Sequence, residues 1–140
     1  MNSDSENFWQ HHSLHYLEMA FSADRLGTLA NPDGHAKKTG DCGDTVEFFL
    51  AIREDTIQSI SFVTQGCMNT NACANTVASM VENKHIDEAW GVTPEKVVEY
   101  LETLPAESVH CAELSVGTLY LALTDYQKSC QAPWKKLYQK

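Results

Sequence analysis

The chain has 140 residues, 43% of them apolar, and a net charge of −9 at pH 7. This length suits one domain with a substantial core, so we predict a single domain over residues 1–140. No basic block offers phosphates a binding surface, which argues against nucleic acid and anionic membranes as partners. No apolar run reaches the roughly 18–20 residues of a membrane-spanning helix, and the polar, acidic start lacks the features of a secretory signal. We therefore predict a cytoplasmic protein.

The first predicted element is an amphipathic helix over about residues 5–22, which forms an N-terminal extension. With Trp9 exposed, this helix could form a homodimer or cover a site. Residues 26–44 follow and are rich in Gly, Pro, Asp and Lys; residues 31–34 indicate a turn, and part of the stretch could be an edge strand. The apolar residues that give the helix its spacing are Phe8, Trp9, Tyr16, Leu17, Ala20 and Phe21.

An antiparallel hairpin is predicted next. Residues 46–52 are almost entirely apolar, residues 53–56 are polar, and residues 57–64 alternate, with Ile60 and Phe62 on one face. After Cys67 the apolar residues recur at the spacing of a helix. The order of elements predicts an α+β fold, with a small antiparallel sheet of about three strands and helices on one face. The predicted helices are one containing residues 73–81, a short one at 86–90, one that begins after Thr93-Pro94, and one over about 108–128, before a tail at about 130–140.

Three of the five cysteines are predicted to lie where one element meets another. Cys42 stands in a glycine-flanked loop before a strand, which would leave its thiol accessible. Cys67 stands between a strand and a helix, and Cys111 follows His110 in the first turn of the last helix. The positive end of a helix dipole favours the thiolate, which binds metals and attacks sulfur. An odd number of cysteines without an export signal argues against a disulfide framework.

The remaining candidates have simpler interpretations. Cys73 falls on an apolar helical stripe and Cys130 follows the last helix, so we interpret both as structural or incidental. Asp41 is typical of a turn residue, and the same holds for Asp44 taken alone. A second cluster is expected to form a polar helix face rather than a metal site; its residues are His11, His12 and His15.

The residues alone favour a metal or sulfur site without establishing it. The separations between the three boundary cysteines, 25 and 44 residues, contain no C-x-x-C pair. Four or five sulfur, nitrogen and oxygen donors suit tetrahedral zinc or iron. Each residue by itself could instead be a buried cysteine, a hydrogen-bonded histidine or a turn aspartate.

Three segments resemble those of a known family. Residues 40–44 (Gly-Asp-Cys-Gly-Asp) resemble its C-G-D loop, residues 64–67 its G-C junction, and residues 104–111 its L-P-x-x-x-x-H-C segment. The family is the iron–sulfur cluster assembly scaffold of the IscU type, which is also the N-terminal domain of NifU. The resemblance covers about residues 24–128.

The resemblance implies a scaffold rather than an enzyme. A cysteine desulfurase would supply sulfur, iron would enter, with an iron donor as a further partner, and a labile [2Fe–2S] cluster would pass to apo-proteins. It implies iron or the cluster as cofactor, with zinc at the same site in isolated protein. The ligands would be Cys42, Cys67 and Cys111 with either His110 or Asp44.

Two departures and two alternatives qualify this interpretation. Ser108 stands at the family's lysine in the L-P-P-V-K docking motif, which argues against a dedicated Hsp70-type chaperone as partner. Residues 22–27 differ from the family's N-P-R-N-x-G. The related SufU type is a zinc-dependent sulfur acceptor, although His110 favours the IscU and NifU side. A structural zinc domain or a redox thiol protein is the other alternative.

Overall fold

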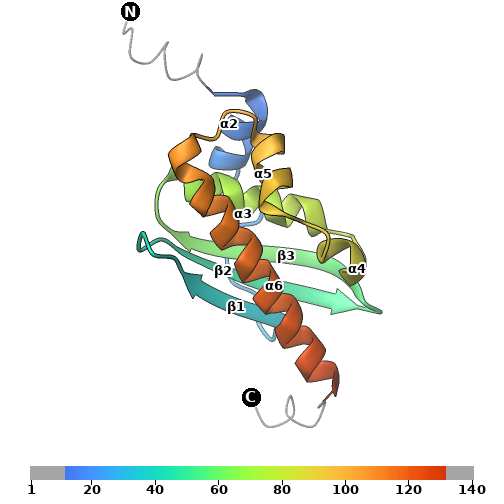
Figure 1. Ribbon diagram of the computed structural model, residues 1–140. Coiled ribbons are helices and arrows are strands. Elements are labelled where there is room, and N and C mark those ends of the chain that lie inside the picture. Colours follow the sequence, from blue (N-terminus) through green and yellow to red (C-terminus); the bar gives the residue numbers. More distant parts are fainter. Residues whose placement is uncertain (1–11, 132–140) are drawn as a thin grey trace, which may run out of the picture.

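The computed structural model describes residues 12–131, and these form an α+β fold (Figure 1). A three-stranded antiparallel sheet has the order β1-β2-β3, and helices cover one of its faces. The predicted fold class is therefore confirmed. The strands are β1 (Gly34–Thr39), β2 (Thr45–Arg53) and β3 (Thr56–Gln65).

The predicted hairpin is β2 paired with β3. Its turn residues Glu54 and Asp55 both have positive φ, 53° and 57°, as in the tight turns that match the twist of paired strands. Phe48 and Phe62 face each other across the two strands, and both are fully buried with their ring centroids 6.3 Å apart. This contact fixes which side of the hairpin faces the helices.

One of the two edge strands is β1, which lies within the stretch where an edge strand was predicted. Its sequence is mostly polar, and it is held by pairing with β2 from Gly34–Leu50 to Thr39–Thr45. A β-carbon at Gly34 would lie 2.6 Å from the Ala122 carbonyl oxygen, so glycine permits the close approach of the last helix.

The remaining helices follow the predicted order. Helix α5 (Pro94–Leu101) begins as predicted. The Thr93 side chain accepts a hydrogen bond from the Lys96 amide, and a proline stands in the first turn. The longest of these helices, α6 (Val109–Gln131), lies across β1 and β2 (Figure 1). They are α3 (Met68–Val81), α4 (Ile86–Ala89), α5 (Pro94–Leu101), the 3-10 turn η1 (Ala106–Ser108) and α6 (Val109–Gln131).

The N-terminal helix differs from its prediction. Within the described residues it is α2 (Leu14–Phe21), which begins at the N-cap Ser13; residues 1–11, with Phe8 and Trp9, lie outside them. Phe21 was predicted on the inner face but is 59% exposed, since the buried face is formed by Tyr16, Met19 and Ala20.

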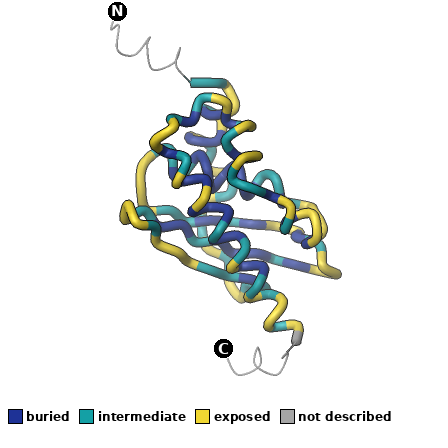
Figure 2. Tube along the Cα trace, viewed as in Figure 1, coloured by how far each residue is buried: buried dark blue, intermediate teal, exposed yellow. Residues whose placement is uncertain are grey.

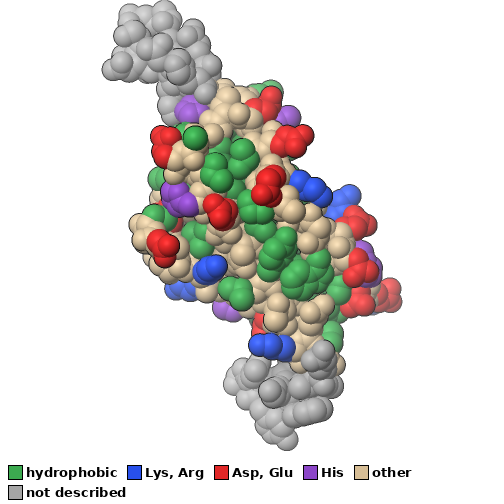
Figure 3. Space-filling model, in the orientation of Figure 1, with side chains coloured by type: hydrophobic (Ala, Val, Ile, Leu, Met, Phe, Trp, Pro, Cys, Tyr) green, Lys and Arg blue, Asp and Glu red, His purple; other side chains and the backbone are tan. Residues whose placement is uncertain are grey.

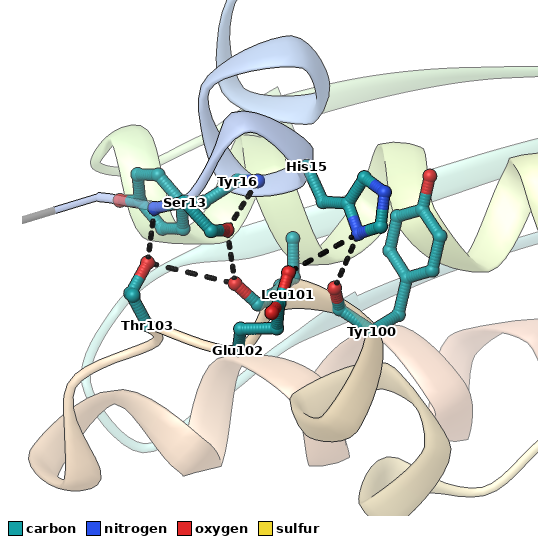
Figure 4. A network of polar contacts seen from close by, with 7 residues as sticks. All are labelled: Ser13, His15, Tyr16, Tyr100, Leu101, Glu102 and Thr103. Carbon is teal, nitrogen blue, oxygen red and sulfur yellow. Dashed lines mark hydrogen bonds and ion pairs between the residues drawn. The ribbon is translucent and has the colours of Figure 1, made fainter.

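Hydrogen bonds fix α2 against the end of α5 (Figure 4). The Ser13 hydroxyl donates to the Leu101 carbonyl at 2.6 Å, and the Ser13 amide donates to the Thr103 hydroxyl at 2.9 Å. The Ser13 hydroxyl also accepts from the Tyr16 amide at 3.0 Å, so it closes the first turn of α2 while it docks the helix.

One apolar core lies between the sheet and the helices, where buried segments gather in Figure 2. It includes Cys73, which is fully buried, and Leu119 of α6. In residues 12–131 no helix has the length and apolar character needed to cross a membrane. The predicted start of the N-terminal extension and the tail after Gln131 lie outside the described residues.

Candidate metal centre

Three segments that are distant in the sequence meet at one end of the sheet. The β1–β2 turn carries Cys42, and Cys67 is the N-cap of α3 directly after β3. Because β2 pairs antiparallel with β3, Thr45 lies opposite Gln65, so Asp44 comes next to the β3–α3 junction. The first turn of α6 then adds Cys111, with η1 leading into it.

The donor atoms of the five predicted ligands form two overlapping groups. Cys42, Asp44 and His110 form one, and Asp44, Cys67 and Cys111 form the other; within each group the donor atoms lie within 4.8 Å of one another. Cys111 Sγ lies 3.9 Å from Asp44 Oδ2 and 3.6 Å from His110 Nε2. Metal–ligand bonds of about 2.0–2.3 Å in a tetrahedral site give donor–donor edges of about 3.3–3.8 Å. The 3.6 and 3.9 Å distances lie close to these edges, and Asp44 is common to both groups.

The imidazole of His110 is oriented as a ligand. Its Nδ1 lies 2.9 Å from the Glu107 carbonyl oxygen, which can only accept a hydrogen bond, so Nδ1 carries the proton. The lone pair is then on Nε2, the atom that faces Cys111. A histidine ligand commonly donates its other ring N–H to a carbonyl in this way.

The roles of two residues at this site, Thr70 and Gly66, were not predicted from the sequence. Thr70 is fully buried and donates a hydrogen bond to Asp44 Oδ2 at 2.6 Å, and its hydroxyl lies 3.8 Å from Cys67 Sγ and 3.7 Å from Cys111 Sγ. A β-carbon at Gly66 would lie 2.8 Å from both Asp44 Cγ and Thr70 Oγ1. Thr70 could have been found, because it lies three residues after Cys67 in a predicted helix and so on the same face.

The thiols differ in exposure. Cys42 and Cys67 are exposed, whereas Cys111 is 1% exposed. Burial raises the pKa of Cys111 to about 11, the hydrogen bond with Thr70 opposes this, and the charges of its neighbours add to it. In the metal-free protein the thiol form of Cys111 is therefore favoured, contrary to the expectation from the start of the last helix, and loss of solvation is the largest cause.

The other candidates lie apart from these groups. Burial raises the pKa of Cys73, which lies in the core. Cys130 is exposed and lies within α6, not after it as predicted, because the helix continues to Gln131. Asp41 is exposed and lines a cavity of about 380 Å³ beside Cys42 and His110.

The histidines near the start of α2 make ring contacts. His12, ahead of the helix, stacks on Tyr16 of α2, and His15 of α2 stacks on Tyr100 of α5, each with ring centroids 4.5 Å apart. His15 Nδ1 also lies 3.2 Å from the Tyr100 carbonyl oxygen (Figure 4). His11 lies outside the described residues.

The chain is similar in sequence to a known family of proteins. A family model described as the NifU-like N terminal domain matches residues 23–132. The iron-sulfur cluster assembly scaffold protein IscU 1 of Archaeoglobus fulgidus is 33% identical over 104 residues, which cover 74% of this chain and 63% of that protein.

Two crystal structures have a similar fold. A candidate iron-sulfur cluster assembly scaffold protein for the SUF system from Fervidobacterium islandicum has a TM-score of 0.70 and 18% identity, over 81% of this chain and 97% of that one. The N-terminal part of a NifU-like protein from Brucella abortus has a TM-score of 0.69 and 18% identity, over 83% and 94%.

The family assignment rests on the extent of these matches. The chain spans 63% of the length of the Archaeoglobus relative, while the family model covers nearly all of the described fold. At 18% identity the two crystal structures show the fold alone, and it is the fold found here. The chain belongs to the NifU-like N-terminal domain family.

Proposed function

We propose that this domain is a scaffold on which a labile [2Fe–2S] cluster is assembled from iron and desulfurase-derived sulfur and then passed to apo-proteins. The observation that supports this proposal most directly is the convergence of three thiols, one carboxylate and one imidazole at one end of the sheet. Cys42, Cys67 and His110 of this set are exposed, so a partner protein can reach the cluster's ligands directly.

The mixed donor set suits a cargo that must leave again. Thiolates bind iron–sulfur clusters firmly, and replacing one of them by nitrogen or oxygen weakens the hold on the metal. Asp44 and His110 are the two candidates for the fourth ligand: Asp44 belongs to both groups of donor atoms, and His110 lies in the group that contains Cys42. Thr70 donates to Asp44 Oδ2, and both carboxylate oxygens keep a lone pair that a metal can use.

The test is anaerobic reconstitution of metal-free protein with ferrous iron, cysteine and a desulfurase, followed by visible absorption. We expect charge-transfer bands in the wild type and in Cys130→Ala, whose exposed cysteine lies at the far end of α6. The bands should be lost in Cys42→Ala, Cys67→Ala and Cys111→Ala. Bands that survive all three substitutions would refute assembly at this centre.

A zinc-dependent sulfur acceptor is the second candidate, because sulfur, nitrogen and carboxylate oxygen donors of this kind also bind zinc. In that case a thiolate of this site attacks the outer sulfur of the desulfurase persulfide, takes that sulfur as its own persulfide and releases the desulfurase thiolate. Asp44→Ala separates the two functions. In a scaffold it should prolong the lifetime of the bound cluster, whereas in a zinc acceptor it removes a ligand and lowers sulfur transfer.

Partners of this site would include a desulfurase, apo-acceptors and an iron donor. Acidic side chains are spread over the face of α5 and α6 (Figure 3), and Glu95, Glu99 and Glu113 line a cavity of about 500 Å³ there. This face would suit a partner with a basic surface. A homodimer and a cytoplasmic location stay predictions.

A dedicated Hsp70-type chaperone is not expected to be a partner. Ser108, at the family's lysine position, is only 8% exposed, so it offers little to a docking protein. Calorimetry with a peptide of residues 104–108 should detect no binding to such a chaperone; micromolar binding would contradict the proposal.

A further inference from the structure

A chain of polar side chains lies behind the metal centre and connects α2 to η1. Tyr16 of α2 is fully buried, and its hydroxyl donates a hydrogen bond to Asn69 Oδ1. The amide nitrogen of Asn69 donates in turn to Ser108 Oγ at 2.9 Å. Both hydrogen-bonding groups of the Asn69 side chain are therefore used, one on each side.

The chain joins the two segments that carry Cys67 and Cys111. Asn69 lies in the first turn of α3, two residues after Cys67, and Ser108 lies at the end of η1, three residues before Cys111. The two sulfur atoms lie within 4.8 Å of each other. The Asn69–Ser108 hydrogen bond thus fixes the distance between two segments whose relative position sets the spacing of the thiols.

Tyr16 is itself held rigidly. Ser13 accepts from the Tyr16 amide and ties the start of α2 to Leu101 and Thr103 (Figure 4). Burial, with the charges of nearby cysteines adding to it, raises the pKa of Tyr16 to about 12. The hydroxyl is protonated at neutral pH, as in any tyrosine, and donates to Asn69 Oδ1. A rigid donor of this kind can orient an amide that would otherwise rotate freely.

We infer that Tyr16 is a positioning residue for the metal centre, which it orders through Asn69 and Ser108 without touching the metal. The inference rests on the proposed function only in that the five donors must bind metal. It assigns to α2 a role in shaping the centre, although α2 supplies no ligand. Without the Tyr16 hydroxyl, Asn69 Oδ1 loses its donor, the amide can turn away from Ser108, and the thiol spacing is no longer fixed.

The test is Co²⁺ binding by Tyr16→Phe, followed by visible absorption, because the intensity of the d–d bands reports tetrahedral geometry. We expect Kd to rise about tenfold, the lower end of the effect of removing groups behind metal ligands, with weaker d–d bands. The matched control is Tyr120→Phe, which removes another tyrosine hydroxyl, bound to the Val92 carbonyl away from the centre. Tyr120→Phe should leave the Kd for Co²⁺ and the visible spectrum unchanged, even if it lowers Tm as much as Tyr16→Phe does.

A second variant keeps the test independent of how well Tyr16→Phe folds. Ser108→Ala removes the other end of the chain, and it should weaken Co²⁺ binding in the same way. The double variant Tyr16→Phe/Ser108→Ala should be little worse than either single one, because both act through Asn69.

The failures can be told apart. If the wild-type protein binds no Co²⁺, or if the Cys111→Ala variant binds Co²⁺ as tightly as the wild type does, the metal centre itself is refuted and the inference fails with it. If wild-type binding depends on Cys111 but Tyr16→Phe and Ser108→Ala keep the wild-type Kd and spectrum, the positioning role alone is overturned.

Discussion

Gly66→Ala should disrupt the metal centre from within. Its new β-carbon would lie 2.8 Å from Asp44 Cγ, 2.8 Å from Thr70 Oγ1 and 3.0 Å from Asp44 Oδ1, closer than atoms can approach. Thr70 is fixed in a buried helix, so the short side chain of Asp44 must move. The backbone at Gly66 does not have the positive φ that favours glycine, so the effect is steric.

The magnitude follows from the bond that is lost. The 2.6 Å hydrogen bond from Thr70 to Asp44 has a carboxylate acceptor, and such bonds contribute about 1.5–3 kcal/mol. At about 1.4 kcal/mol per factor of ten, the affinity for metal should fall about 10- to 100-fold. Competition between the protein and a chromophoric chelator for Co²⁺ or Zn²⁺ measures this change.

Two other glycines supply the controls. Gly34→Ala places a β-carbon 2.6 Å from the Ala122 carbonyl oxygen, far from the centre, so it should cost about 1–3 kcal/mol of folding free energy with unchanged metal affinity. Gly117→Ala meets only the flexible end of Lys38 and should change neither quantity adversely. A Gly66→Ala variant with wild-type metal affinity would show that Asp44 is not held as described, and would refute the reasoning.

Three further predictions concern the same centre. Thr70→Val should lower Co²⁺ affinity about tenfold by removing the donor to Asp44, while Thr70→Ser, which keeps it, should not; the same chelator competition measures both. Because burial raises the pKa of Cys111 to about 11, its thiol is protonated at neutral pH and metal binding must release that proton. Affinity should therefore rise with pH, and calorimetry in buffers of different ionisation enthalpy should detect proton release; a pH-independent affinity would contradict this. Chelation should leave the far-UV circular dichroism unchanged, because the apolar core lies between sheet and helices; unfolding on chelation would instead indicate a structural zinc site.

The parts of the fold that could be predicted are those in which local signals and burial agree. The β2–β3 hairpin has an apolar strand, a polar turn and an alternating strand, and Thr93-Pro94 is both cap and first turn of α5. In β1 the sequence carries little pattern, because this mostly polar strand is held by backbone pairing with β2 more than by its side chains. Phe21 was misplaced because the buried face of α2 is decided by what it packs against, not by the spacing alone.

The site shows a similar division. The proximity of the five candidate donors could be predicted because they stand in recognisable segments at element boundaries, and the structure brings them into two overlapping groups. The supporting residues could not, since the contacts of Thr70 with Asp44 and of Tyr16 with Asn69 span 26 and 53 residues and appear only in the folded chain. The protonation of Cys111 also depends on burial by other elements, which a helix start alone does not reveal.

The position of His110 and Cys111 in α6, the last of the described elements, sets the order in which the centre can form during synthesis. Cys42 and Cys67 are made first, and 44 residues separate Cys67 from Cys111. At about 5–20 residues per second, two thiols and Asp44 exist for about two to nine seconds before the third thiol is made. Until the first turn of α6 has been made, the growing chain holds an incomplete set of ligands, so the complete set of donors forms only late in synthesis.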